Sequence, residues 1–136
     1  MIKISKMADY AVVVLEVLAR PHNDPISASY IAEQTKLPDP TVSKVLKLLA
    51  RRNIIASVRG PSGGYILPSQ PETISIASII EATDGPIAIT DCVSSAGNCC
   101  ERSSICSIHG RWDKVNAALV QAMENMSLKQ VMKNYE

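Results

Sequence analysis

The sequence predicts a mainly α-helical fold with one small β-hairpin. In several segments the apolar residues recur every three or four positions, which is the period of an amphipathic helix. One central segment instead has two short apolar runs around a glycine-rich tip, which is typical of a hairpin. The 136 residues are 46% hydrophobic, which is enough for a packed core, and no run reaches the roughly 18 apolar residues of a membrane span.

The first half of the chain contains three predicted helices. The first covers residues 6–20 and ends at a proline. The second covers residues 27–34 and begins at a serine that can cap it. The third covers residues 39–52, where Asp39 is expected to cap the helix and Pro40 to take its first position.

The hairpin is predicted to follow these helices directly. Residues 54–59 and 65–67 are the two extended runs, and residues 60–64 form the glycine-rich tip between them. Three helices followed by a two-stranded hairpin form a winged helix-turn-helix, in which the third helix enters the major groove of DNA. We therefore expect residues 1–72 to be a winged helix-turn-helix DNA-binding domain.

The second half, residues 73–136, is expected to combine a short helix, a loop that contains all four cysteines and a long C-terminal dimerisation helix. Residues 73–83 have a helical period and stop at a Gly-Pro pair, whereas residues 88–110 have no period. The final helix has an apolar seam at spacings of three and four, formed by Trp112, Val115, Leu119, Ala122 and Met126. Such a seam packs on a partner helix, here a second copy of the chain, or alternatively on the chain's own domain.

Charge is distributed unevenly, although the formal net charge is only +1. Residues 1–70 contain nine Lys or Arg against five acids, whereas residues 71–136 contain five against eight. A basic first half points to a polyanionic partner such as double-stranded DNA; a solvated helix face is the plainer alternative.

The third predicted helix has an apolar side and a polar side, as a recognition helix requires. Val42, Val45, Leu46 and Leu49 fall on one side, where they can anchor the helix. Hydroxyl groups can bond to base edges and cations to phosphates, so the candidate DNA-contacting residues of this helix are Thr41, Ser43, Lys44, Lys47 and Arg51.

The hairpin tip supplies a second candidate contact. Arg59 can enter the narrow minor groove, and Gly60, Gly63 and Gly64 can let the backbone approach DNA closely. The alternative is that these three glycines only make the turn.

Four cysteines lie close together, at Cys92, Cys99, Cys100 and Cys106. The start of the chain does not resemble an export signal, so we expect a cytoplasmic protein with reduced thiols. Clustered thiols there indicate a metal or redox site. The paired Cys-x-x-Cys knuckles of structural zinc are missing, and a metal-free thiol switch remains an alternative. A thiol enzyme is not expected, because neither a neighbouring base nor a Cys-x-x-Cys pair is evident.

Residues 4–11, 41–44 and 57–65 resemble the Rrf-two (BadM-type) family of winged-helix transcription regulators, and the resemblance covers nearly the whole chain. Residues 85–87 and 106–112 are most similar to the branch that regulates SUF iron–sulfur cluster assembly. The resemblance implies a homodimeric DNA-binding regulator that represses those genes when it holds an iron–sulfur cluster. It implies no enzymatic activity, no small-molecule substrate and no membrane association.

The resemblance also suggests ligands for the cluster. Cys92 and Cys106 match two of three family cysteines, and either Cys99 or Cys100 is the third, with the spacing to Cys106 favouring Cys100. The fourth ligand is His109, which would indicate a 2Fe–2S cluster, or Asp9 from a second subunit, which would indicate 4Fe–4S. We favour His109, although a histidine there can be an ordinary polar group, and an aspartate in a first helical turn can simply stabilise the helix dipole. The alternative functions are a nitric-oxide or thiol-redox responsive regulator of the same fold, and an iron–sulfur carrier or redox protein.

Overall fold

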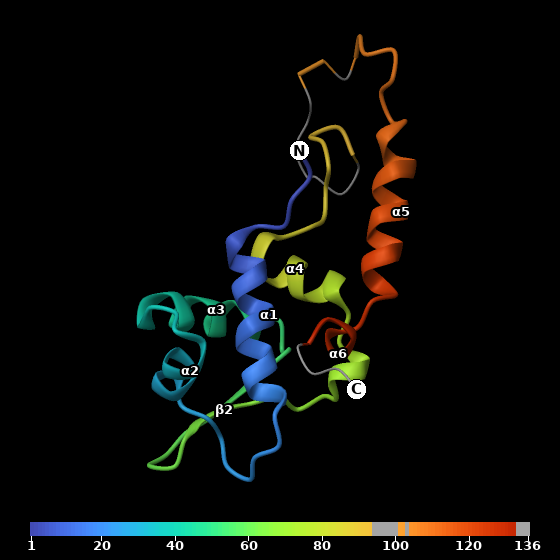
Figure 1. The fold of residues 1–136 in the computed structure, drawn as a ribbon. Helices are drawn as coiled ribbons and strands as arrows, with labels where there is room; N and C mark the ends of the chain where they lie inside the picture. Colours follow the sequence, from blue (N-terminus) through green and yellow to red (C-terminus); the bar gives the residue numbers. More distant parts are fainter. Residues whose placement is uncertain (94–100, 103, 133–136) are drawn as a thin grey trace.

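The computed structural model describes residues 1–93, 101–102 and 104–132. They form a mainly helical structure with one antiparallel two-stranded hairpin, which confirms the predicted fold class (Figure 1). No helix among the described residues is long and apolar enough to cross a membrane. The elements are α1 (Lys6–Ala19), α2 (Ala28–Thr35), α3 (Asp39–Arg51), β1 (Ala56–Val58), β2 (Gly64–Ile66), the 3-10 turn η1 (Pro71–Thr73), α4 (Ile76–Asp84), α5 (Trp112–Glu124) and α6 (Leu128–Val131).

Helix α1 is the central element of the fold. It contacts α2, α3 and α4, and Figure 1 shows it standing between α3 on one side and α4 on the other. Ser5 caps its first turn by accepting a hydrogen bond from the Ala8 amide at 3.1 Å. Its buried residues repeat at helical spacing and are Ala8, Ala11, Val14, Leu15, Val17 and Leu18.

The predicted cap of α2 is confirmed, whereas that of α3 is wrong. The Ser27 side chain accepts a hydrogen bond from the Tyr30 amide at 3.2 Å. In α3, however, Pro38 is the N-cap, and no side chain caps the helix. Asp39 already lies within the first helical turn, where its carboxylate stabilises the positive end of the helix dipole.

The hairpin is fixed to the helical body as well as to itself. Strands β1 and β2 pair antiparallel, and Tyr65 of β2 also pairs with Ile26 in the α1–α2 connection. The Tyr65 amide donates to the Ile26 carbonyl at 2.7 Å, and the Ile26 amide donates back at 2.9 Å. This bridge sets the direction in which the hairpin leaves the body.

The C-terminal elements share the core of the winged-helix part. Ile74, Ile79 and Leu128 belong to the same buried cluster as Val14 and Leu46. The 3-10 turn η1 precedes α4, so the predicted helix over residues 73–83 begins later than expected, at a serine cap. The two parts expected at residues 1–72 and 73–136 thus share one core, and their division by function stays a prediction.

Helix α5 is shorter than the helix that the apolar seam from Trp112 to Met126 predicted. It ends at Glu124, so Met126 lies beyond it, and the expectation of one long C-terminal helix is corrected. The reason is local, because Ser127 begins the short helix α6 with a capping box that includes Gln130. The Met126 carbonyl accepts the Ile76 amide at 2.9 Å, which holds the break against α4.

We predict that Gly63→Ala destabilises the hairpin. A Cβ at this position would lie against the Val58 carbonyl oxygen and within 2.8 Å of the Gly60 carbonyl oxygen, and backbone atoms cannot move aside cheaply. We expect a loss of about 1–3 kcal/mol in the free energy of unfolding, measured by thermal and urea denaturation. The neighbouring exposed Ser62→Ala is the control. Equal stability of the two variants would contradict the close approach at Gly63.

A second prediction concerns the contact between α6 and η1. Lys129 Nζ lies 2.6 Å from Glu72 Oε1, and this hydrogen bond lowers the pKa of Glu72 below its ordinary value. A lowered pKa adds stability above the ordinary carboxyl pKa, and that stability disappears as the pH falls through the folded-state value. We expect Lys129→Met to raise the Glu72 pKa in an NMR titration, with Lys114→Met as the control. An unchanged titration curve would show that this contact does not form in solution.

Candidate nucleic-acid interface and thiol segment

The exposed side of α3 carries the predicted DNA-contacting residues. Ser43, Lys44, Lys47 and Arg51 are exposed, and Thr41 is half-buried. The opposite side is anchored in the core, as the sequence predicted, through Val42, Val45, Leu46 and Leu49, which are fully buried. The helix therefore offers a row of hydroxyl groups and cations on a rigid support.

At the tip of the hairpin, the predicted residues fall into two groups. Arg59 and Gly60 are exposed, so both are accessible to a ligand. Gly63 and Gly64 are half-buried and have reasons within the chain to be glycine. A Cβ on Gly64 would lie 2.5 Å from the Ile26 carbonyl oxygen, at the bridge that holds the hairpin. Arg59 is thus the hairpin side chain best placed to contact a partner.

The thiol segment leaves α4 at Gly85 and enters α5 at Trp112. Cys92 is half-buried, and its Sγ lies 3.0 Å from the Thr90 hydroxyl oxygen. Cys106 is also half-buried. Cys99 and Cys100 lie outside the described residues, so the choice between them stays a prediction.

Cys106 and His109 lie in one tight turn. The His109 amide donates to the Cys106 carbonyl at 3.3 Å, and the Cys106 amide donates to the Arg102 carbonyl at 2.9 Å. His109 is exposed, as is Asp9 in the first turn of α1. Among the described residues, no group of three His, Cys, Asp or Glu side chains comes together to hold a metal. Thiolates with an imidazole on one segment nevertheless fit the ligand preferences of an iron–sulfur cluster.

One residue of this region was not identified from the sequence. Asn116 on α5 is only 6% exposed, and its side chain bonds to the backbone of the segment that leads to Cys92. Its Oδ1 accepts the Ile89 amide at 2.9 Å, and its Nδ2 donates to the Ile87 carbonyl at 3.0 Å. The only available sign was an amide in the middle of an otherwise apolar stretch.

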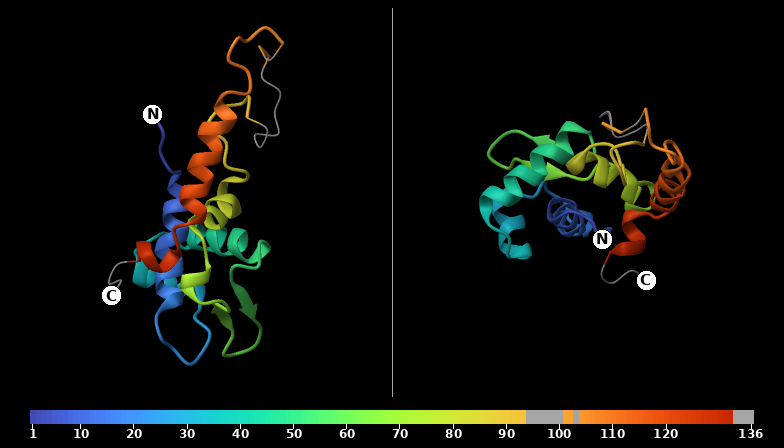
Figure 2. Two further views of the ribbon diagram at one scale, coloured as in Figure 1. Left: turned by 90° about the vertical axis from the view of Figure 1, so that its right-hand side faces the viewer. Right: turned by 90° about the horizontal axis from the view of Figure 1, so that it is seen from above.

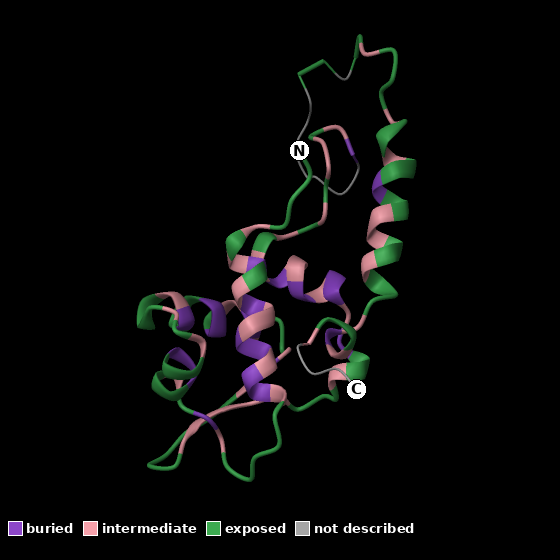
Figure 3. Cartoon of the chain, in the orientation of Figure 1, coloured by how far each residue is buried: buried purple, intermediate pink, exposed green. Residues whose placement is uncertain are grey.

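The seam of α5 is largely exposed in the single chain. Trp112 and Val115 are 40% and 43% exposed, Ala122 is exposed, and Leu119 is half-buried (Figure 3). The alternative in which this seam packs on the chain's own domain does not agree with these exposures. Trp112 and Val115 therefore leave apolar surface of α5 uncovered within the part of the chain that the structure describes.

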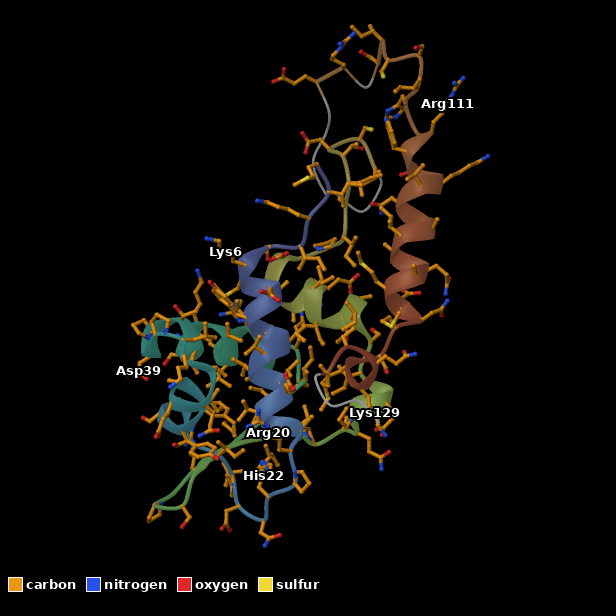
Figure 4. All side chains as sticks on the ribbon, viewed as in Figure 1. Lys6, Arg20, His22, Asp39, Arg111 and Lys129 are labelled. Carbon is orange, nitrogen blue, oxygen red and sulfur yellow. The ribbon has the colours of Figure 1, made fainter. Side chains whose placement is uncertain are left out.

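The two candidate sites lie at different ends of the molecule. In Figure 4, Asp39 marks the start of α3 and Arg111 marks the entry to α5, and the two are widely separated. Figure 2 shows that α5 runs alongside the helical body, with residues 104–111 beyond its upper end. A change at the thiols can therefore reach α3 only through the intervening helices or through a partner subunit.

The sequence is similar to those of known transcription regulators. Residues 4–134 match the Rrf2 family, described as an iron-dependent transcriptional regulator. The chain is 26% identical to the transcriptional regulator IscR of Erwinia tasmaniensis, over 98% of this chain and 81% of that protein. It is 27% identical to IscR of Vibrio vulnificus, over 98% of this chain and 79% of the other.

Solved structures of similar proteins share the fold. CymR, the global cysteine regulator of B. subtilis, superposes with a TM-score of 0.72 at 25% identity, and 96% of each chain is covered. IscR of T. potens superposes with a TM-score of 0.71 at 25% identity, over 99% of this chain and 89% of that one. The oxidised form of CymR from Staphylococcus aureus gives 0.70 at 26% identity, over 99% of both chains.

These relatives are transcription regulators and not enzymes, and the family match extends over nearly all of the residues that build α3, the hairpin and the thiol segment. The chain is a DNA-binding transcription regulator that belongs to the Rrf2 family.

Proposed function

We propose that this regulator is a cytoplasmic homodimer that senses iron–sulfur cluster status and represses genes of iron–sulfur cluster assembly. The observation that carries the proposal is the position of the thiols. Cys92 and Cys106 lie on one segment that joins α4, which packs on α3, to α5, which carries the exposed seam. A ligand that orders this segment can therefore change how two subunits present their recognition helices.

The DNA-binding role is supported by the exposed face of α3 and by Arg59. In a dimer, two recognition helices meet successive major grooves when they lie about 34 Å apart, one turn of the duplex. Lys44 and Lys47 would position the protein on phosphates, whereas Ser43 and Thr41 would read base edges. Arg59 would enter the minor groove beside the recognition helix.

The dimer is supported by apolar surface on two elements. Besides the α5 seam, Met1, Ile2 and Ile4 are exposed, and they line a groove of about 380 Å³ together with Leu119 and Met123 of α5. A second copy of the chain would bury both surfaces, which is the expected arrangement for a symmetric dimer.

The cluster would be held by Cys92, Cys106 and one of the Cys99–Cys100 pair, with His109 as the fourth ligand of a 2Fe–2S cluster. Asp9 from a second copy is the alternative fourth ligand, and it would point to a 4Fe–4S cluster. A bound cluster supplies one-electron redox chemistry and sensitivity to oxidants. The contribution of the chain is to present these side chains on a segment that is anchored at both ends.

A thiol-redox or nitric-oxide responsive regulator is the second candidate. The likeness to CymR, including its oxidised form, supports it, because Cys92 and Cys106 could respond to oxidants without a metal. A cluster carrier is less well supported, since a carrier has no use for the exposed cations of α3 and the hairpin.

We predict that Lys44→Ala and Arg59→Ala weaken binding to a duplex that the protein itself has selected from a random library. Removing a phosphate contact should lower the slope of log affinity against log salt concentration by about one. Each variant should lose up to about 3 kcal/mol of binding free energy. The measurement is fluorescence anisotropy over a range of salt concentrations. Lys114→Ala, an exposed lysine on α5, is the control. Affinities equal to that of the control would place the DNA surface elsewhere.

We also predict that protein purified without oxygen contains iron and acid-labile sulfide and absorbs visible light. Cys92→Ala and Cys106→Ala should lose this absorbance and keep the helical circular dichroism of the fold, while Ser107→Ala keeps both. Single Cys99→Ala and Cys100→Ala variants identify the middle ligand, and His109→Ala and Asp9→Ala identify the fourth. A colourless wild-type protein, even after reconstitution with iron and sulfide, would refute the cluster and leave the thiol-redox candidate.

A further inference from the structure

We infer that Asn116 is a positioning residue that clips residues 86–93 to α5, so that order in the Cys92 segment and the packing of α5 change together. The inference rests on the proposed function, in which the thiols of this segment hold a cluster. Ile87, Ile89 and Asn116, which form the contact, all belong to the described part of the chain.

The clip is a two-sided hydrogen bond. The Asn116 side chain accepts from the Ile89 amide at 2.9 Å and donates to the Ile87 carbonyl at 3.0 Å. Residues 86–89 belong to no helix or strand, so this amide supplies bonds of the kind that a neighbouring strand would otherwise supply. A single side chain thereby fixes both the position and the orientation of the segment.

Burial makes this contact consequential. Asn116 is the one buried polar side chain among the described residues, whereas the rest of α5 is exposed or half-buried. Its side chain reaches the segment that follows α4 at Ile87 and Ile89. Leaving a buried amide or carbonyl without its partner costs more free energy than the bond itself contributes, so the clip favours an ordered segment.

The clip ends close to a candidate ligand. Ile89 precedes Cys92 by three positions, and between them the Thr90 hydroxyl oxygen lies 3.0 Å from the Cys92 sulfur. On α5, Asn116 lies four positions after Trp112, so both belong to adjacent turns of the helix that carries the exposed seam. A displacement of Cys92 can thus reach the helix expected at the dimer interface through two hydrogen bonds, one between Cys92 and Thr90 and one between Ile89 and Asn116.

Loading of a cluster should therefore protect the segment and α5 together. The contact joins positions that are 27 apart in the sequence, and a cluster that ties Cys92 to the chain between them would shorten the chain that the clip must close. Without Asn116, the cluster could still bind, but residues 86–93 would no longer transmit its presence to α5.

The test compares Asn116→Leu and Asn116→Asp with Gln121→Leu, an amide-to-leucine control at an exposed position of the same helix. Amide hydrogen exchange is measured on oxygen-free protein with and without cluster. In Asn116→Leu, which removes both hydrogen bonds, exchange in residues 86–93 should rise by roughly tenfold, the size expected for the loss of two net hydrogen bonds, while α1–α3 stay unchanged. In Asn116→Asp, the carboxylate can still accept the Ile89 amide but cannot donate to the Ile87 carbonyl, so the rise should be smaller. The ratio of operator affinities between loaded and cluster-free protein should fall towards one.

Each outcome separates the inference from the proposed function. In wild-type protein, residues 86–93 and α5 should gain protection together on loading. If the wild type switches but the Asn116 variants keep its exchange pattern or its affinity ratio, Asn116 is not the clip and the inference is wrong. If the wild type binds no cluster, the proposed function fails, and exchange in the cluster-free protein still decides whether Asn116 orders the segment.

Discussion

The packing of α4 between the helices α1 and α3 on one side and α5 on the other is the constraint on which the rest of the structure depends. Ile79 is fully buried, and α4 packs against α1, α3 and α5. Helix α3, the proposed recognition helix, rests on one side of this core, and the thiol segment begins at Gly85, immediately after α4. Close-packed cores transmit displacements instead of absorbing them, so a change at the thiols has a physical route to the proposed DNA-binding surface.

A second connection reinforces this route at the surface. The Ser5 hydroxyl donates to the Asp84 carboxylate at 2.8 Å, while the same oxygen caps α1. Asp84 is the last residue of α4, so the start of α1 is tied to the point where the thiol segment departs. Together with the Asn116 contact, this bond attaches the base of the segment to both α1 and α5. The segment is therefore held at its base, although the candidate cluster ligands are spread along its length.

Much of the fold could be predicted from the sequence, because helical periodicity and proline breaks are local signals. The buried face of α3 and its exposed cations followed directly from the spacing of Val42, Val45 and Leu46. The cap at Asp39 was predicted wrongly because Pro38 already takes that position, and the end of α5 was missed because Ser127 starts a new helix. Asn116 could not be predicted, since its partners lie 27 and 29 residues away and no sequence period connects them. The cluster ligands remain a prediction from residue type and resemblance.

In the proposed regulator, the state of the thiol segment sets the affinity of the protein for DNA. The most direct measurement is the operator affinity of one oxygen-free preparation, determined at constant salt before and after its cluster is removed by a chelator. A coupling free energy of about 1–3 kcal/mol, typical of allosteric proteins, predicts affinities that differ by roughly 5- to 150-fold. Equal affinities of the two forms, with the cluster shown to be present in one and absent from the other, would contradict the account.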